Sequence, residues 1–131
     1  MIGLDTNVLV RYLTQDDRLQ SARATELIER RLTETDPGFV SVVALVETVW
    51  VLKRGYGFAD KRIATVIEWL LKADALVLEN EREVFTAMVA LKRSDGSFAD
   101  MLIGALGRNA GCSVTATFDR KAARLRGFAL I

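Results

Sequence analysis

Four acidic residues stand at places where a carboxylate could do chemistry. Asp5 directly follows the apolar run MIGL, and Asp119 closes the run SVTATFD near the other end of the chain. Glu47 lies within VVALVETVWVL, and Asp100 lies within SFADMLIGAL. The chain has no histidine, which removes the usual general base and the commonest zinc ligand. Any catalysis must therefore use carboxylates, hydroxyls, lysine or a metal with oxygen ligands, which means Mg²⁺ or Mn²⁺.

Three of these acids also have a structural explanation. Asp5 and Asp119 each precede an expected helical segment, where aspartate is a common N-cap. Ser97 as N-cap and Asp100 three residues later would form a capping box. Taken one residue at a time, the sequence leaves the structural and the chemical explanation open.

Glu47 is harder to explain by helix capping. The residues three and four positions away are all apolar: Val43, Ala44, Trp50 and Val51. A carboxylate buried there without a partner would be costly or would be forced into its neutral form. Glu47 therefore needs a cation from elsewhere in the fold, such as a metal or a distant arginine, or an edge of the apolar stripe that is open to water.

The apolar pattern alternates between short strands and longer helices. Buried strands are predicted over 1–4, 38–41, 75–78, 113–117 and 128–131. Helices are predicted over 18–34, 42–54, 60–72, 81–92 and 98–108, in addition to one that begins near Thr6. This alternation predicts an α/β fold in which a parallel sheet lies between helices.

In such folds ligands bind beyond the carboxyl ends of the strands. Three of the four acids follow a strand or lie in the first turn of the next helix, so all four can face the same edge of one sheet. Without a cation, clustered carboxylates would repel by about 3 kcal/mol per pair at ~5 Å and an effective dielectric constant of ~20. The sequence therefore predicts that these acids bind a divalent metal.

The composition limits the other classes. A chain of 131 residues is expected to form one domain, residues 1–131. Half of its residues are hydrophobic and one is proline, which argues against disorder, and we expect no membrane-spanning segment. The lack of a signal-peptide pattern and the single cysteine favour a soluble protein of the cytoplasm. If metal neutralises the four acids, the net charge of +1 leaves +5 on the rest of the chain, which suits RNA as a partner.

The motifs also resemble those of a known family. MIGLDTNVLVRYL, the glutamate in SVVALVETVWVL, FADMLIGALGRNAG and TATFDRKAARL are similar to the successive acidic motifs of PIN-domain ribonucleases. Among these the similarity is greatest to the VapC toxins of type II toxin-antitoxin pairs, and it covers nearly the whole chain. The resemblance implies a three-layer α/β/α sandwich with a central, mainly parallel sheet of about five strands.

The resemblance implies a site and a function as well. By position, the four acids of the family correspond to Asp5, Glu47, Asp100 and Asp119, which would hold one or two Mg²⁺ or Mn²⁺ ions, with Thr117 beside the site. The implied enzyme is an endoribonuclease in which the metal activates a water molecule against the RNA phosphate. The implied partners are an antitoxin protein and a second copy of the chain in a homodimer. Many relatives carry a further acid at the position of Ser97, so the number of metal ions stays open.

Two other classes share part of this pattern. A receiver-like phosphoacceptor domain also groups acids, magnesium and a threonine at strand ends, but the third predicted strand here ends in LEN rather than in an acceptor aspartate. A non-catalytic PIN-like binding module would keep the acidic pocket for an arginine of a partner. The presence of all four acids favours the nuclease over the binding module.

Three further residues carry weaker expectations. Cys112 is expected to be a small buried hydrophobic residue rather than a nucleophile, since no histidine is present to activate it. Trp50 and Trp69 are expected to lie mostly in the core. Some apolar residues around them could instead form a dimer interface, and a periodic pattern alone does not separate the two cases.

Overall fold

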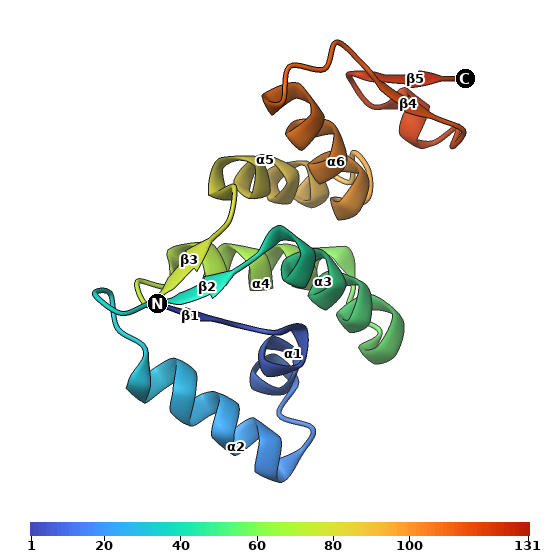
Figure 1. Ribbon diagram of the computed structural model, residues 1–131. Helices are drawn as coiled ribbons and strands as arrows, with labels where there is room; N and C mark the ends of the chain where they lie inside the picture. The colour runs from blue at the N-terminus through green and yellow to red at the C-terminus, as the bar shows by residue number, and fades with distance from the viewer.

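The computed structural model describes the whole chain, residues 1–131, with six α-helices and five short strands (Figure 1). The N-terminal part contains β1 (Ile2–Gly3), α1 (Thr6–Thr14), α2 (Arg18–Glu26), the π-helical turn η1 (Leu27–Arg31) and β2 (Gly38–Val40). The middle contains α3 (Val42–Tyr56), α4 (Asp60–Lys72), β3 (Leu76–Leu78) and α5 (Glu81–Lys92). The C-terminal part contains α6 (Phe98–Asn109), β4 (Thr115–Thr117), the 3-10 turn η2 (Ala122–Arg124) and β5 (Phe128–Leu130).

Short polar side chains fix where three of the helices begin. The side chains of Asp17, Ser41 and Ser97 each accept a hydrogen bond from the backbone N–H three residues later, at 2.8 to 3.1 Å. Each bond satisfies an N–H that has no partner within the helix, which is what defines an N-cap. At the other end of α3, Gly57 adopts φ +67°, a left-handed conformation that ends the helix and favours glycine. These local rules place most helices where the sequence pattern predicts them.

Three strands form one parallel sheet with the order β1-β2-β3. Ile2 lies opposite Gly38, and Gly38 lies opposite Leu76. Successive residues point to opposite faces, so Val40, Leu76 and Leu78 are buried on one face, whereas Val77 on the other face is exposed. The sheet therefore packs its buried face on the helical core.

The hydrophobic core is one continuous cluster of 21 buried residues. It runs from Leu4 after β1 to Leu102 in α6 and takes side chains from α1, α3, α4 and α5. The largest fully buried side chains include Leu52, Ile63 and Ile67. None of the helices combines the length and the apolar character that crossing a lipid bilayer requires.

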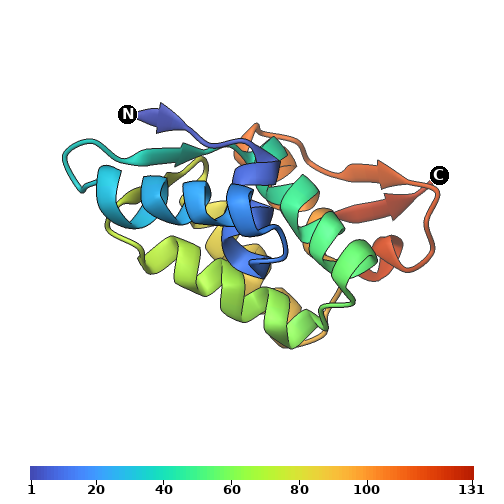
Figure 2. The same ribbon diagram turned by 90° about the horizontal axis from the view of Figure 1, so that it is seen from below.

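The other two strands form a separate parallel sheet on the far side of α6. Thr115 of β4 lies opposite Phe128 of β5. The sheet contacts α6 at two glycines: a Cβ added at Gly104 would lie 2.6 Å from Cε2 of Phe128, and one added at Gly107 would lie 3.1 Å from the Thr115 hydroxyl oxygen. Glycine inside a helix is unfavourable by about 1 kcal/mol relative to alanine, and here it permits a close approach of the strands. Figures 1 and 2 both show β4 and β5 well separated from β1.

The α/β class with parallel strands, as in PIN-like folds, is confirmed. The prediction of about five strands in one central sheet is wrong, because the strands divide into sheets of three and two. The physical reason is the docking of β5 on α6 through Phe128 and Gly104, which keeps β4 away from β1. The helix predicted over 18–34 is also shorter, because α2 ends at Glu26 and continues only as a π-helical turn to Arg31.

Three predictions of burial are wrong. Cys112 is exposed in the segment between α6 and β4. Trp50 is 62% exposed, and Trp69, whose ring stacks on Tyr12 at 5.6 Å between centroids, is 43% exposed. Helical spacing locates the apolar side of a helix but does not show whether another element covers it.

Candidate active site

Asp5 lies at the junction of β1 and α1, and its side chain is not used by the helix. Its backbone carbonyl accepts hydrogen bonds from the N–H groups of Val8 and Leu9, at 3.1 and 3.3 Å. The side chain makes no capping hydrogen bond, although the residue occupies the N-cap position, and it is exposed. The structural explanation therefore accounts for the backbone of Asp5 but not for its carboxylate.

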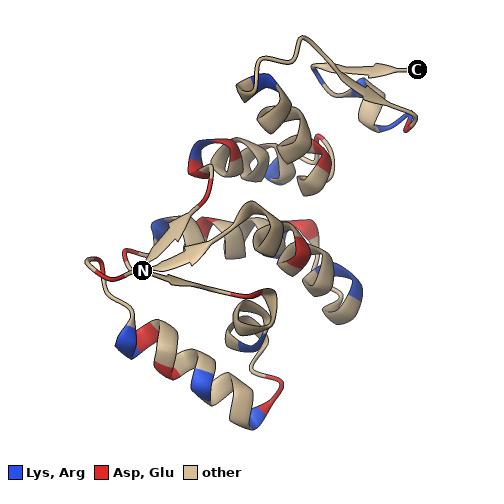
Figure 3. Ribbon diagram, in the orientation of Figure 1, with Lys and Arg blue, Asp and Glu red and all other residues tan.

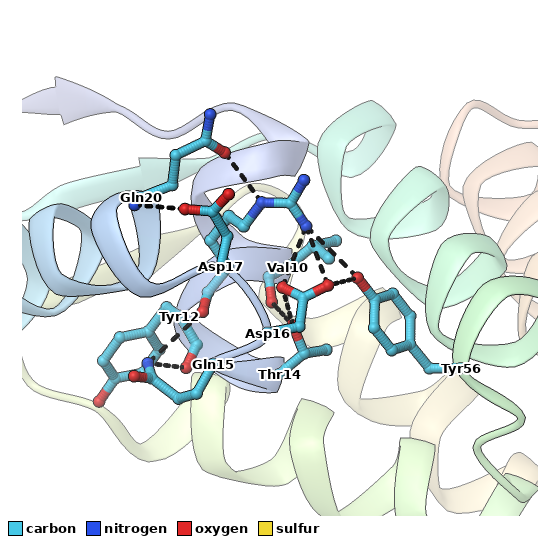
Figure 4. A network of polar contacts seen from close by, with 9 residues as sticks. Val10, Tyr12, Thr14, Gln15, Asp16, Asp17, Gln20 and Tyr56 are labelled. Carbon is cyan, nitrogen blue, oxygen red and sulfur yellow. Dashed lines mark hydrogen bonds and ion pairs between the residues drawn. The ribbon is translucent and has the colours of Figure 1, made fainter.

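Helix α1, which begins after Asp5, is tied to its neighbours by a polar network (Figure 4). The Arg11 guanidinium donates hydrogen bonds to Asp16 at 3.1 Å and to Gln20 of α2 at 2.8 Å. The Tyr56 hydroxyl, at the end of α3, donates a hydrogen bond to Asp16. This hydrogen bond is the largest cause that holds the pKa of Asp16 below its usual value, with Thr14 and Arg11 acting in the same direction. The network thus joins α1, α2 and α3 at the end of α1 that is remote from Asp5.

Asp100 lies in the first turn of α6. Its backbone N–H donates a hydrogen bond to the Ser97 hydroxyl oxygen at 3.1 Å, which confirms Ser97 as the N-cap. The reciprocal half of the predicted capping box, in which the Ser97 N–H would donate to the Asp100 carboxylate, does not form. Asp100 is half-buried, and its carboxylate stays free of the helix.

Asp119 and Thr117 form a tight turn at the end of β4. The Asp119 N–H donates to the Thr117 hydroxyl oxygen at 3.0 Å, and Oδ1 of Asp119 accepts from the Lys121 N–H at 2.8 Å. These bonds orient the Asp119 side chain relative to β4 and leave its second oxygen without a hydrogen-bond partner. Thr117 thereby supports the predicted site through its hydroxyl group.

Asp100 and Asp119, which are 19 positions apart in the sequence, line the same cavity of about 410 Å³. Lys121 and Arg124 also line it, so positive charge lies beside the two carboxylates. A third acid in the lining, Asp95, is not among the ligands that the sequence predicts, although its place in the loop DGS directly before α6 indicates this end of the helix. The arrangement offers carboxylate oxygens for a hard cation next to basic groups for a phosphate.

Glu47 lies elsewhere, exposed on α3. It borders an open apolar hollow of about 480 Å³ whose other lining residues are Val42, Val43, Val46 and Trp50. Of the explanations left open for Glu47, the structure supports the edge of an apolar stripe that is open to water. No arginine or lysine forms an ion pair with it.

A four-carboxylate metal site does not fit within one chain in this arrangement. No three side chains of the His, Cys, Asp or Glu type lie close enough together to hold a metal ion. Asp100 and Asp119 share a cavity, but Asp5 and Glu47 do not line it. Figure 3 likewise shows acidic positions spread from the β1–α1 junction to the region of β4. The separation of the two sheets explains this, because β1 and β4 do not end at the same edge.

The fold and the positions of the acids define an α/β domain with carboxylates at the ends of parallel strands. The chain matches the family model of the PIN domain over residues 2–127 and therefore belongs to the PIN-domain family. PIN domains are in general nucleases, and they typically depend on Mg²⁺ or Mn²⁺. No curated protein matches the chain.

Proposed function

We propose that the protein is an endoribonuclease that depends on Mg²⁺ or Mn²⁺. The observation that carries this proposal is the cavity that Asp100 and Asp119 line together with Lys121 and Arg124. Oxygen ligands suit Mg²⁺ and Mn²⁺, while lysine and arginine suit the phosphates of RNA. Membership of a nuclease family supports the same reaction.

The residues have separate roles in this proposal. Asp100 and Asp119, which line this cavity, would be metal ligands, directly or through water. Asp5 and Glu47, which lie apart from that cavity within one chain, would complete the four ligands only where a second copy of the chain brings them to it. Thr117 positions Asp119 through the hydrogen bond from the Asp119 N–H to its hydroxyl oxygen. Lys121 and Arg124 pair with phosphate oxygens of the bound RNA.

The resemblance of the motifs to VapC toxins supports a biological role. In this role the chain is the toxin of a toxin-antitoxin pair, acts in the cytoplasm, forms a homodimer and is inhibited by a cognate antitoxin. An antitoxin segment could insert an arginine among the acids. The test is co-expression with a small protein whose gene adjoins that of this chain: RNA cleavage should stop at a saturating ratio, and unchanged cleavage would argue against the toxin role.

A second candidate function is a binding module without catalysis. It is favoured by one observation, the absence within one chain of three acids close enough to hold a metal. The receiver-like function has less support, because the acid after β3, Glu79, accepts a hydrogen bond from the Val42 N–H at 2.9 Å and so serves as a helix cap.

The experiment that separates nuclease from binding module is incubation of the purified protein with total RNA in Mg²⁺ or in chelator, followed by sequencing of new 5′ ends. We expect defined cuts with 5′-phosphate ends in Mg²⁺ only. Glu47→Gln should abolish the cuts, whereas Glu34→Gln, at another exposed acid, should leave them unchanged. RNA binding without cuts in Mg²⁺ would favour the binding module.

A further inference from the structure

Each of the two sheets has an open edge that ends at a predicted ligand. β1 pairs only with β2, and β4 pairs only with β5, so each strand has one side without a partner. Asp5 follows β1 by two residues, and Asp119 follows β4 by two residues. An open edge presents backbone N–H and C=O groups that can accept another strand.

The hydrogen bonds define which residues face outward. The N–H groups of Ile2 and Leu4 bond to β2 and its flank, so the backbone polar groups of Gly3, between them, face the open side. The Thr115 N–H donates to the Gly127 carbonyl, and the Thr117 carbonyl accepts from the Ile131 N–H. The backbone polar groups of Ala116, between them, therefore face the open side of β4.

In a parallel pair, a residue whose N–H and C=O both bond to the neighbouring strand lies opposite a residue that makes no bond to that strand. Gly3 would use both of its groups on β4, whereas Thr117 already uses its own toward β5. Gly3 can therefore lie opposite Thr117, which places Ile2 opposite Ala116. The same register brings Asp5 opposite Asp119.

Apolar side chains are exposed along both edges. Ile2 at the β1 edge is 37% exposed, and Phe118 just after β4 is 81% exposed. Joining the two sheets would remove part of this apolar surface from water, which is favourable. Burial of apolar side chains and new backbone hydrogen bonds would therefore both favour pairing of the two open edges.

The docking of the second sheet on α6 favours a partner from another chain. The Phe128 ring lies against Gly104, and the Arg108 guanidinium donates a hydrogen bond to the Arg126 carbonyl at 3.4 Å. Helix α6 is itself fixed in the core by Phe98 and Leu102. Figure 1 shows that β4 lies away from β1 of the same chain. These contacts fix that position, whereas a second chain can supply its β4 without breaking them.

We propose that β4 of a second copy adds in parallel to the open edge of β1, with Gly3 opposite Thr117. A two-fold axis repeats the contact, so each copy gives its β4 edge to the other and the assembly closes as a dimer. Each site then takes Asp5 and Glu47 from one copy and Asp100 and Asp119 from the other. The metal-binding role of this shared site rests on the proposed function, whereas the strand pairing does not.

The test is a disulfide across the proposed strand pair. In a Cys112→Ser background, which removes the exposed native thiol, Ile2→Cys and Ala116→Cys are introduced into one chain. Neighbouring strands lie about 4.8 Å apart, within the range of roughly 4.4 to 6.8 Å between Cα atoms that a disulfide spans. Oxidation should yield a covalent dimer on a non-reducing gel, and neither single-cysteine variant should form the doubly linked species. An internal disulfide in a monomer, or no disulfide, would overturn the proposal.

A mixing experiment tests the shared site separately. Asp5→Asn and Asp119→Asn, each inactive alone, are unfolded together and refolded at equal concentration. Half of the dimers are then mixed and each holds one intact site of two, so roughly a quarter of the wild-type nuclease activity should return. If wild type is active and the mixture is not, the shared site is wrong. If the cross-linked dimer forms and wild type is inactive, the proposed function is wrong while the pairing stands.

Discussion

Removal of the Ser97 hydroxyl should lower stability by an amount that the structure allows us to work out. The Ser97 oxygen accepts the Asp100 N–H at 3.1 Å and is the side-chain cap of α6. Replacement of such a cap by alanine costs about 1 kcal/mol. At about 2.1 cal/mol/K per residue, the unfolding entropy of a 131-residue chain is about 0.28 kcal/mol/K. Ser97→Ala should therefore melt about 4 °C below wild type.

The assay is thermal unfolding followed by circular dichroism, with two matched variants. Ser97→Asp keeps a capping oxygen and should melt within about 2 °C of wild type. Ser41→Ala removes the equivalent cap of α3, which accepts the Ala44 N–H at 3.1 Å, and should fall by a similar 4 °C or so. If Ser97→Ala melts with wild type while Ser41→Ala falls, then Ser97 does not hold α6 and the position of Asp100 has been explained wrongly.

Two further predictions concern charge. Hydrogen bonds from Lys92 and Lys72 lower the pKa of Glu68 to about 2, from a usual 4.5, so the stabilisation they give is complete above about pH 4.5 and is lost as the pH falls toward 2. Glu68→Gln should therefore lose less stability than wild type between pH 5 and pH 2, measured by urea unfolding; an equal loss would contradict this assignment. Millimolar Mg²⁺ or Mn²⁺ should raise the melting temperature of wild type, and Asp100→Asn should blunt that rise. Identical melting of wild type in metal and in chelator would contradict a metal site.

The helices could be predicted closely because their signals are local. The segments predicted over 60–72 and 81–92 coincide with α4 (Asp60–Lys72) and α5 (Glu81–Lys92). Neither helix has a side-chain cap, but the apolar spacing that indicates each one lies within the segment itself, so the sequence contains the signal. The end of α3 was placed two residues too early because Gly55 continues the helix, and Gly57 is the glycine in the left-handed conformation.

The division of the sheet could not be predicted in the same way. Each strand was found at its expected place, but the partner of β4 depends on how Phe128 packs against Gly104, a contact between residues 24 positions apart. The pattern of apolar residues identifies the strands but does not determine which strand pairs with which. The exposure of Trp50 follows from the same limit, since its apolar neighbours on α3 are not covered within the chain.

The sequence predicts which residues belong to the candidate site, but it does not predict how they are arranged in space. Asp5 and Asp119 were identified from their places after apolar runs, and the structure keeps them at the ends of β1 and β4. Whether they meet depends on β1 and β4 being neighbours, which is a property of sheet order. The pairing proposed between two copies would place β4 of one copy next to β1 of the other.

The cleavage rate of Asp5→Asn tests the proposed metal-dependent nuclease most directly. The Asp5 side chain makes no capping hydrogen bond, and asparagine has nearly the same size, so the variant should fold and melt within about 2 °C of wild type. The rate of cleavage of a structured RNA in saturating Mg²⁺ is measured for both proteins. If Asp5 is a metal ligand, the rate should fall by orders of magnitude. Full activity of the folded Asp5→Asn protein would contradict the assignment of Asp5 as a metal ligand and with it the proposed four-acid metal site.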